Sequence, residues 1–353
     1  MNHEFSESIV GCLLGTALGD ALGLPMEGLS RRRQSAMFPD LTRFHFFFGR
    51  GMISDDTEHA GLVAEAVAVS GGRRELFAAH LARGLRWWLL SLPAGVGWAT
   101  LRSILKLWVG FGYNRSGVYS AGNGPAMRSP LLGVLYGADR SRLIDLVRIS
   151  TRLTHSDPKA EQGALAVAWA AYLAGQHREE PRDFLDTIPT ILGPNADELS
   201  GLLGKAADSA ASGQSTADFA ADLGLERGVT GYMFHTVPVV IQAWLRHPGD
   251  FRTAIASIIR CGGDADTTAA ILGGIIGAAV GRAGLPSEYF SNLWLWPKTI
   301  SWFEQMGPAL AQAVETEVAN PGPPYPWWGV WPRNLFFLMV VLTHGFRRLL
   351  PPY

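Results

Sequence analysis

The chain has 353 residues, and at about 100 to 200 residues per domain this length suggests two domains. Hydrophobic residues make up 48% of the sequence and charged residues 17%, which excludes a disordered chain and favours a large packed core. The 30 basic and 31 acidic residues leave a net charge of −1, so we expect no nucleic acid partner. An anionic ligand would have to be bound by a local site.

The first apolar segment, residues 9–25, has the small and apolar residues of a signal-peptide core. Glu4 and Glu7 stand where a signal peptide has basic residues, and Asp20 interrupts the apolar run, so we do not interpret it as one. Cys12 and Cys261 lack the spacing of a disulfide framework or a zinc site. These features together predict a soluble, cytoplasmic protein.

Apolar residues recur mostly at intervals of three and four, which predicts a mainly α-helical fold. The clearest helix is expected over residues 73–92, where Pro93 ends the pattern. Similar segments follow, in chain order, at 140–153, 158–174, 234–246, 251–260 and 267–283. Loops rich in glycine or aromatic residues are expected at 44–51, 111–124 and 224–231, and loops commonly carry functional residues.

Two of the expected helices carry glycines at four-residue intervals. Such a row costs helix propensity but lets another backbone approach closely. We therefore expect segments from both ends of the chain to pack in the centre of one core. The glycines are Gly11, Gly15 and Gly19 in the first helix, and Gly273, Gly277 and Gly281 in the late one.

The most distinctive polar feature is a pair of oxygen-rich clusters, Ser-Asp-Asp-Thr at 54–57 and Asp-Ala-Asp-Thr at 264–267. Each precedes an apolar helix, and neither contains the His or Cys that Zn²⁺ prefers. One cluster alone could be a helix cap, with Asp55 and Glu58 forming a capping box. Two such clusters would bring four carboxylates together, and a pair of divalent cations is the natural way to neutralise them.

With these clusters included, the sequence resembles the ADP-ribosylglycohydrolase family over about residues 6–285. The resemblance is carried by five stretches in the family's order, any one of which could arise by chance. They are Gly-Asp-Ala-Leu-Gly at 19–23 followed by Glu27, Ser-Asp-Asp-Thr at 54–57, Ala-Gly-Asn-Gly-Pro-Ala-Met-Arg at 121–128, Leu-Thr-His-Ser at 153–156, and Gly-Gly-Asp-Ala-Asp-Thr-Thr at 262–268.

The resemblance implies an all-α protein, a single orthogonal helical bundle with two Mg²⁺ or Mn²⁺ ions. It implies hydrolysis at the anomeric carbon of ADP-ribose by an attacking water, through an oxocarbenium-like transition state. The positions that match the family's metal ligands are Ser54, Asp55, Asp56, Asp264, Asp266 and Thr267.

Other matched positions imply catalytic and ligand-binding roles. Glu27 matches a glutamate on a mobile loop at the metal centre, and Asp55, Asp56 or Glu27 could orient or deprotonate the attacking water. Which of the three acts as the base stays open. The loop that holds the diphosphate and the distal ribose is matched by Ser120, Gly122, Asn123 and Gly124, and His155 matches a histidine that lines this pocket. From the residues alone, the loop could be a simple turn, and His155 could be a histidine near the start of the next helix.

The sequence departs from the family pattern at Glu58 and His59, where members often have Gln and Met. His59 could tune the site or simply be a packed helix residue. The aromatic run 46–48, with Arg43, His45 and Arg50 around it, could stack on adenine or contact the modified protein. Burial of these aromatic side chains in the core is the simpler interpretation.

Because the two clusters are far apart in sequence, neither half of the chain can assemble the site, so we expect one catalytic domain over residues 1–320. Residues 321–353 form a Pro- and Trp-rich C-terminal extension outside the resemblance. We expect an extended segment and a helix packed on the body. A partner-binding or membrane-touching patch is the alternative.

The resulting hypothesis is an enzyme that removes mono-ADP-ribose from a modified protein side chain, arginine rather than serine. ADP-ribose is the expected product. Two alternatives remain open: a module that binds ADP-ribose or gives immunity by covering an ADP-ribosylating toxin, and a hydrolase of a small ADP-ribosylated metabolite.

Overall fold

The structure is a computed structural model that describes residues 3–46 and 48–351. These residues form helices and isolated β-bridges and contain no extended strand, so the expected all-α architecture is confirmed. The first half of the chain contains α1 (His3–Gly23), η1 (Leu24–Met26), α2 (Arg31–Met37), α3 (Asp55–Ser70), α4 (Arg74–Leu90), α5 (Trp98–Trp108), α6 (Tyr113–Ser116), α7 (Gly124–Met127), α8 (Pro130–Tyr136), α9 (Arg140–Arg152) and α10 (Pro158–Gly175).

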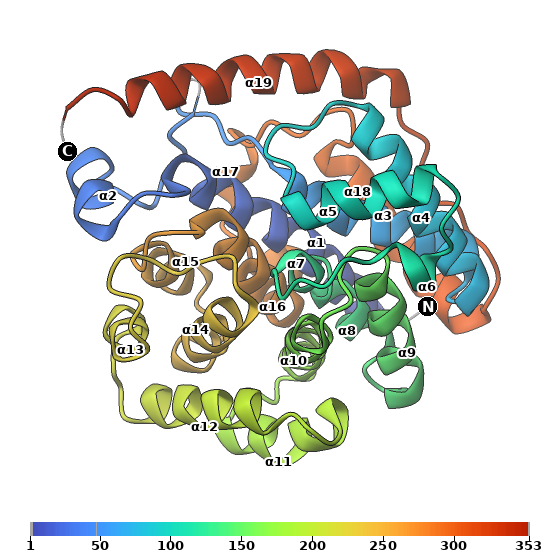
Figure 1. Cartoon of the computed structure of the whole chain (residues 1–353), viewed down its shortest axis with the longest axis horizontal. Coiled ribbons are helices and arrows are strands. Elements are labelled where there is room, and N and C mark those ends of the chain that lie inside the picture. Colours follow the sequence, from blue (N-terminus) through green and yellow to red (C-terminus); the bar gives the residue numbers. More distant parts are fainter. Residues whose placement is uncertain (1–2, 47, 352–353) are drawn as a thin grey trace.

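The second half completes the bundle. It contains α11 (Pro181–Leu192), α12 (Asp197–Ala211), α13 (Thr216–Asp222), α14 (Met233–Arg246), α15 (Phe251–Ile259), α16 (Ala265–Gly284), α17 (Ser287–Phe290), α18 (Ile300–Thr316), η2 (Trp327–Gly329) and α19 (Val330–Arg347). In Figure 1, α10 is seen end-on while α12 and α19 run lengthwise, so the helices cross steeply rather than lying parallel.

Helices α1 and α16 pack backbone to backbone through the middle of the molecule, as the glycine rows predicted. A Cβ atom added at Gly15 would lie 2.1 Å from the Gly273 carbonyl oxygen, and one at Gly11 would lie 2.1 Å from the Gly277 oxygen. The close approach continues to Gly23, which lies against Ala265. The C-terminal end of α1 is therefore held beside the N-terminal end of α16, where the second acidic cluster begins.

The boundaries of the expected helices agree with the structure to within about two residues. The expected helix at 267–283 is an exception in its last turn, because Gly281 has φ 63° and ψ −177°, so the regular helix breaks there. α1 and α16 are long and apolar enough to cross a membrane, but the relevant windows are 100% and 72% buried inside the molecule. Such helices are typical of a protein core.

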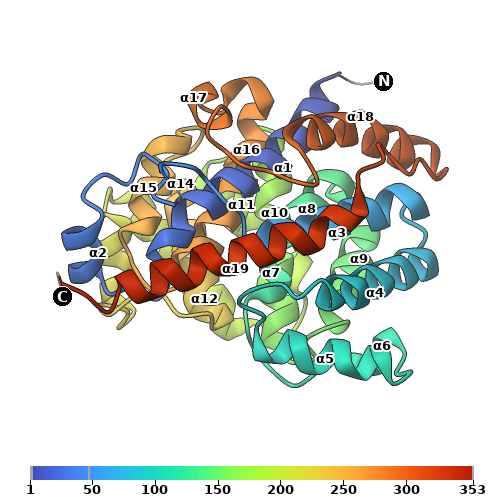
Figure 2. The ribbon, with the colours of Figure 1, turned by 90° about the horizontal axis from the view of Figure 1, so that it is seen from above.

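The chain after Pro321 forms an extended segment, the short helix η2 and the long helix α19. Figure 2 shows α19 lying lengthwise across one side of the molecule, with its far end beside α2. Its outward side leaves a row of apolar side chains exposed: Leu335, Leu338, Met339, Leu342 and Phe346. The packed helix is confirmed, whereas a partner or membrane contact through this row stays a prediction.

Candidate active site

The two acidic clusters converge at the N-termini of α3 and α16. Ser54 is the N-cap of α3 and Asp264 is the N-cap of α16. The Oδ2 atom of Asp56 accepts hydrogen bonds from Ser54 Oγ at 3.1 Å and from Thr267 Oγ1 at 3.2 Å. Two segments 211 residues apart therefore meet at one carboxylate oxygen. Helix N-termini favour negative charge, which makes this a suitable place to gather carboxylates.

The gathered carboxylates are buried close to one another. Burial, followed by repulsion from neighbouring carboxylates, raises the pKa of Asp55, Asp56 and Asp266 well above the usual range. The Oδ1 atoms of Asp56 and Asp266 are buried and have no hydrogen-bond partner. Carboxylate and hydroxyl oxygens are the donors that Mg²⁺, Mn²⁺ and Ca²⁺ prefer. This donor set fits a hard divalent cation.

The carboxylates of the two clusters do not by themselves form a complete coordination shell. Among the described residues, no three carboxylate, imidazole or thiol groups are gathered closely enough to hold one ion by themselves. The hydroxyls of Ser54 and Thr267 complete the donor set, because both already point at Asp56. We base the fit on this convergence and on the two unpartnered oxygens.

Asp20, a fully buried residue on α1, organises the first cluster and was not predicted as a site residue. Its carboxylate accepts hydrogen bonds from the backbone N–H groups of Ser54 and Thr57, and from Thr57 Oγ1 at 2.5 Å. Burial raises the pKa of Asp20 to about 6, although these bonds oppose the rise. The sequence signal was present, because an acidic residue interrupts the apolar run of α1, and buried charges need partners. Asp20 thus fixes the first turn of α3 from the central helix.

Backbone hydrogen bonds connect the loops around the second cluster. Gly263 N–H donates to Leu29 O at 2.9 Å, and Gly28 N–H donates to Gly263 O at 2.6 Å. On the other side, Asp264 N–H donates to Val229 O at 2.7 Å. Gly263 has φ 79°, and a Cβ there would lie 2.0 Å from the Val229 oxygen, so only glycine fits. This explains the Gly-Gly that precedes the second cluster.

Glu27 lies immediately after η1 and is exposed. The protein around its carboxyl group displaces water and raises its pKa, and the Asp264 carboxylate adds to the rise, whereas Arg348 opposes it. The electrostatic influence of Glu27 also raises the pKa of Asp266. Glu27 is therefore an accessible carboxylate on the rim of the acidic cluster.

The glycine-containing loop at 120–124 lies directly beside the cluster. The side-chain amide of Asn123 donates to Asp264 Oδ2 at 2.6 Å and to Thr236 Oγ1 at 3.0 Å. Ser120 Oγ accepts from the N–H of Gly122. A Cβ at Gly122 would lie 3.1 Å from His155 Nε2, and one at Gly124 would lie 3.3 Å from His155 Cε1. The structure thus brings the expected ligand-binding residues together and joins them to the acidic cluster.

A family model for ADP-ribosylglycohydrolase matches residues 1–320 of the chain. The chain belongs to the ADP-ribosylglycohydrolase family. Its members hydrolyse the glycosidic bond of ADP-ribosyl groups, so this chain is a hydrolase of that class. The site-residue assignments that the motifs implied are not tested by the family match and stay predictions.

Curated relatives agree with this assignment, and a solved structure shares the fold. The ADP-ribosyl-[dinitrogen reductase] glycohydrolase of Rhodospirillum rubrum is 26% identical over 300 residues, which cover 80% of this chain and 89% of the relative. The ADP-ribosylhydrolase ARH3 of Gallus gallus is 25% identical over 337 residues, covering 79% and 87%. A solved ADP-ribosylglycohydrolase-related protein complex has a TM-score of 0.65 at 24% identity, covering 88% of this chain and 99% of that one. The expected fold is thereby confirmed.

In this family member a buried arginine, Arg128, holds the glycine loop and the histidine in place. Its guanidinium donates to Gly124 O at 3.0 Å, to Ser150 O at 2.7 Å and to Thr154 Oγ1 at 2.7 Å. Thr154 Oγ1 in turn lies 2.9 Å from His155 Nδ1. Burial lowers the pKa of Arg128 to about 9, and Asp55 opposes that fall. Arg128 ends the Ala-Gly-Asn-Gly-Pro-Ala-Met-Arg stretch, so its motif was found but its role was not.

Burial disfavours the charged form of both His155 and His59, which lie near the ligand loop. Burial lowers the pKa of His155 to about 3, and the neighbouring Arg128 lowers it further. Burial also lowers the pKa of His59 well below the usual range. His59 packs edge-on against Trp88, with ring centroids 4.4 Å apart, which supports the packed-residue interpretation.

The aromatic approach at 43–50 is mostly structural. Phe44 and Phe46 are buried, in agreement with the simpler interpretation, whereas Phe48 is 97% exposed. Arg43 forms an ion pair with Asp40. Phe47 lies outside the described residues, so its place in the run is not assigned.

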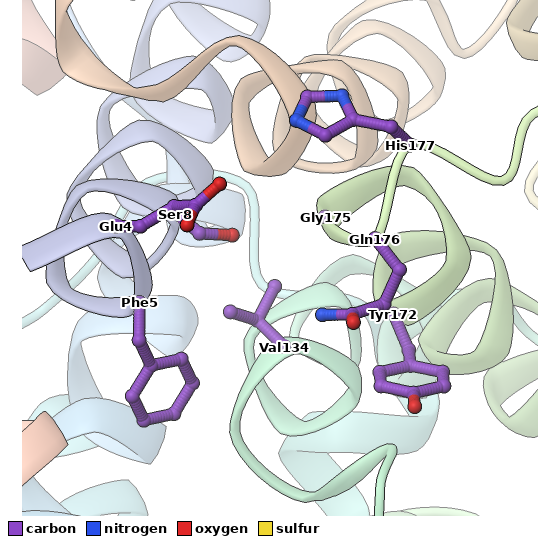
Figure 3. A pocket seen from close by; sticks show the side chains of 8 residues that line it. All are labelled: Glu4, Phe5, Ser8, Val134, Tyr172, Gly175, Gln176 and His177. Carbon is purple, nitrogen blue, oxygen red and sulfur yellow. The ribbon is translucent and has the colours of Figure 1, made fainter. Parts of the chain in front are cut away.

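One hollow among the described residues lies away from this site, at the N-terminal end of α1. Its volume is about 270 Å³, and Figure 3 shows Glu4, Ser8, Tyr172, Gln176 and His177 around it. No carboxylate cluster or glycine loop of the catalytic type faces it, so we do not connect it with the hydrolase reaction.

Proposed function

We propose that this enzyme is a metal-dependent hydrolase that removes mono-ADP-ribose from a modified protein side chain, with arginine preferred to serine. The observation that supports this most strongly is the meeting of Ser54, Asp56 and Thr267 at one oxygen, with Asp264 tied to the ligand loop through Asn123. A cation centre and a nucleotide-binding loop would thus be adjacent. The names of the two curated relatives are consistent with such a substrate.

The residues that would hold two Mg²⁺ or Mn²⁺ ions are those at the two helix N-termini. They are Ser54, Asp55, Asp56, Asp264, Asp266 and Thr267. When bound, such ions supply positive charge for orienting the ribose hydroxyls and for lowering the pKa of the attacking water. The raised pKa values of the carboxylates are the expected cost of a site built to bind cations.

The chain's own groups would then position the substrate and accept the proton of water. The N–H groups around Gly122 and Gly124 are suited to a diphosphate, because glycines let the backbone approach an anion closely. The carboxylates of Glu27, Asp55 and Asp56 are the candidate bases. Glu27 is the most accessible of the three, because Asp56 is buried and Asp55 is partly buried.

The low pKa values of the two histidines near the ligand loop support the preference for arginine. Burial lowers the pKa of His155 and His59, so an imidazolium that protonates a leaving group at neutral pH is disfavoured at both positions. An ADP-ribosylated guanidinium carries its positive charge before cleavage and leaves as neutral guanidine when the bond to the anomeric carbon breaks. A serine oxygen leaves as an alkoxide unless an acid protonates it, so it places a greater demand on the site.

The proposal is tested by measuring the release of free ADP-ribose from arginine-linked, serine-linked and small-molecule substrates. We expect release from the arginine-linked protein in Mg²⁺ or Mn²⁺, slower release from the serine-linked protein, and none with a chelator. Activity that is unaffected by the chelator would contradict metal dependence. Tight ADP-ribose binding without release would support the immunity module instead, and release from the small molecule alone would support the metabolite hydrolase.

A further inference from the structure

We propose that α19 and its C-cap Arg348 form a clamp that positions the catalytic loops, with Arg348 acting as a positioning residue for Glu27. This inference rests on the proposed role of Glu27 in the hydrolysis. α19 lies beyond residue 320, where the family match ends, so the clamp is a feature of this chain rather than of the matched domain.

The N-terminal end of α19 holds the segment that leads into the first acidic cluster. Arg333 donates to Glu58 Oε1 at 2.7 Å and to the carbonyl oxygen of Ile53, the residue before Ser54. The second carboxylate oxygen of Glu58 accepts from Trp88 Nε1 at 2.6 Å. The Arg333 and Glu58 side chains are only 9% and 16% exposed, so the ion pair is shielded from solvent. Glu58, which departs from the family pattern, is thus the partner of the extension.

The C-terminal end of the same helix holds the segment that carries Glu27. Arg348 Nη2 donates to the Pro25 carbonyl oxygen at 2.8 Å, and His344 Nε2 lies 2.8 Å from the same atom. Arg348 also lies within electrostatic reach of Glu27 and Asp266, and its positive charge attracts both. The guanidinium of Arg348 therefore holds the backbone two residues before Glu27 and also attracts the acidic cluster.

The middle of α19 packs on both segments at once. Phe337 is 2% exposed and shares a small apolar cluster with Leu24, Phe46 and Met52. Leu24 precedes Pro25, and Met52 precedes Ile53, so the apolar contacts lie beside the two polar grips. Arg333 and Arg348 are 15 positions apart in the chain, which corresponds to about 22 Å along a helix. A rigid rod of this length fixes the distance between the two loops.

The test compares the purified full-length variants Arg348→Gln and Arg348→Lys with the matched control Arg347→Gln. Arg347 is exposed, and its guanidinium donates to the Pro351 carbonyl oxygen, whereas that of Arg348 donates to the Pro25 carbonyl oxygen of the Glu27 segment. We expect Arg348→Gln to lower kcat about tenfold or more with little change in KM, because misplacing a catalytic group affects the chemical step. Arg348→Lys should recover most of kcat, and Arg347→Gln should leave it unchanged.

Hydrogen exchange provides a readout that does not depend on activity. In Arg348→Gln we expect faster exchange of the amides at residues 24–29 but not of those in α10, and no such change in Arg347→Gln. Equal kcat and equal exchange for Arg348→Gln and Arg347→Gln would overturn the clamp. If the wild-type protein releases no ADP-ribose from any substrate, the proposed function fails, and the exchange measurement still decides whether Arg348 positions the Glu27 loop.

Discussion

At the scale of single residues, the buried carboxylates of the site repel one another, and a bound cation would offset this repulsion. Asp266 has a buried oxygen without a partner, and burial, followed by repulsion from neighbouring carboxylates, raises its pKa. We predict that Asp266→Asn stabilises the metal-free protein by roughly 1 kcal/mol, because it removes a buried like charge at the cost of function. The same variant should lose most of the stabilisation that Mg²⁺ gives to the wild type.

Thermal unfolding with EDTA and with Mg²⁺ measures both effects. The matched control is Asp186→Asn, because Asp186 is an exposed aspartate on α11, remote from the site. A lower melting temperature for Asp266→Asn in EDTA would show that Asp266 is held by favourable contacts within the protein instead.

His155 should make the protein sensitive to acid. Its pKa is lowered from about 6.5 to about 3 in the folded state, so the unfolded chain takes up a proton first as the pH falls. Its contribution to stability is therefore complete above about pH 6.5 and is lost at about 1.4 kcal/mol per pH unit toward pH 3. We predict a shallower acid-induced loss of stability in His155→Gln, measured by urea unfolding between pH 4.5 and 7. Identical slopes would mean that His155 is not buried in its neutral form.

The residues of the site were partly predictable from the sequence. Oxygen donors marked the clusters at 54–57 and 264–267, and glycines marked the loop at 120–124. The structure brings these three segments together. Asp20 and Arg128 were not predicted, because their role is to bind backbone groups of distant segments. Only the three-dimensional contact reveals which loop a buried charge supports.

At the scale of elements, the packing of α1 on α16 sets the geometry of the site. The missing side chain at Gly15 lets the Gly273 carbonyl approach within 2.1 Å of where a Cβ would be. We predict that Gly15→Ala destabilises the protein by about 3 kcal/mol or more, since neither backbone can move aside easily. Chemical denaturation measures this change.

The control for this prediction is Gly201→Ala on α12, where a Cβ would meet no atom within 4 Å. Because alanine favours the helix more than glycine, this variant should gain about 1 kcal/mol. If both glycines tolerated alanine equally, the two central helices would not be in backbone contact.

Helix periodicity located α4, α9, α10, α14, α15 and α16, because apolar stripes record which face is buried, whereas α5, α11, α12 and α18 were not predicted. Periodicity did not predict which segments α19 contacts, since the apolar stripe of an amphipathic helix shows that one face is buried but not against which loops. Arg333 and Arg348 hold these loops by side-chain hydrogen bonds to the backbone carbonyl oxygens of Ile53 and Pro25. Carbonyl groups are present at every residue, so no sequence pattern marks them.

At the scale of the whole molecule, one hydrophobic core extends from Ile9 on α1 to Ala311 on α18. We predict a single cooperative unfolding transition, with far-UV circular dichroism and tryptophan fluorescence giving the same urea midpoint. Two separated midpoints would instead support the two domains that the length alone suggested. The division into a catalytic domain of residues 1–320 and an extension of residues 321–353 stays a prediction.

The proposed divalent-cation centre is formed by two segments that lie 211 residues apart in the chain. The most direct test is calorimetric titration of the metal-free protein with Mn²⁺, in the wild type and in Asp56→Asn and Asp266→Asn. We expect two bound ions in the wild type and a large loss of binding in both variants, because each cluster supplies part of the donor set. Unchanged Mn²⁺ binding in either variant, or no binding to the wild type, would contradict it.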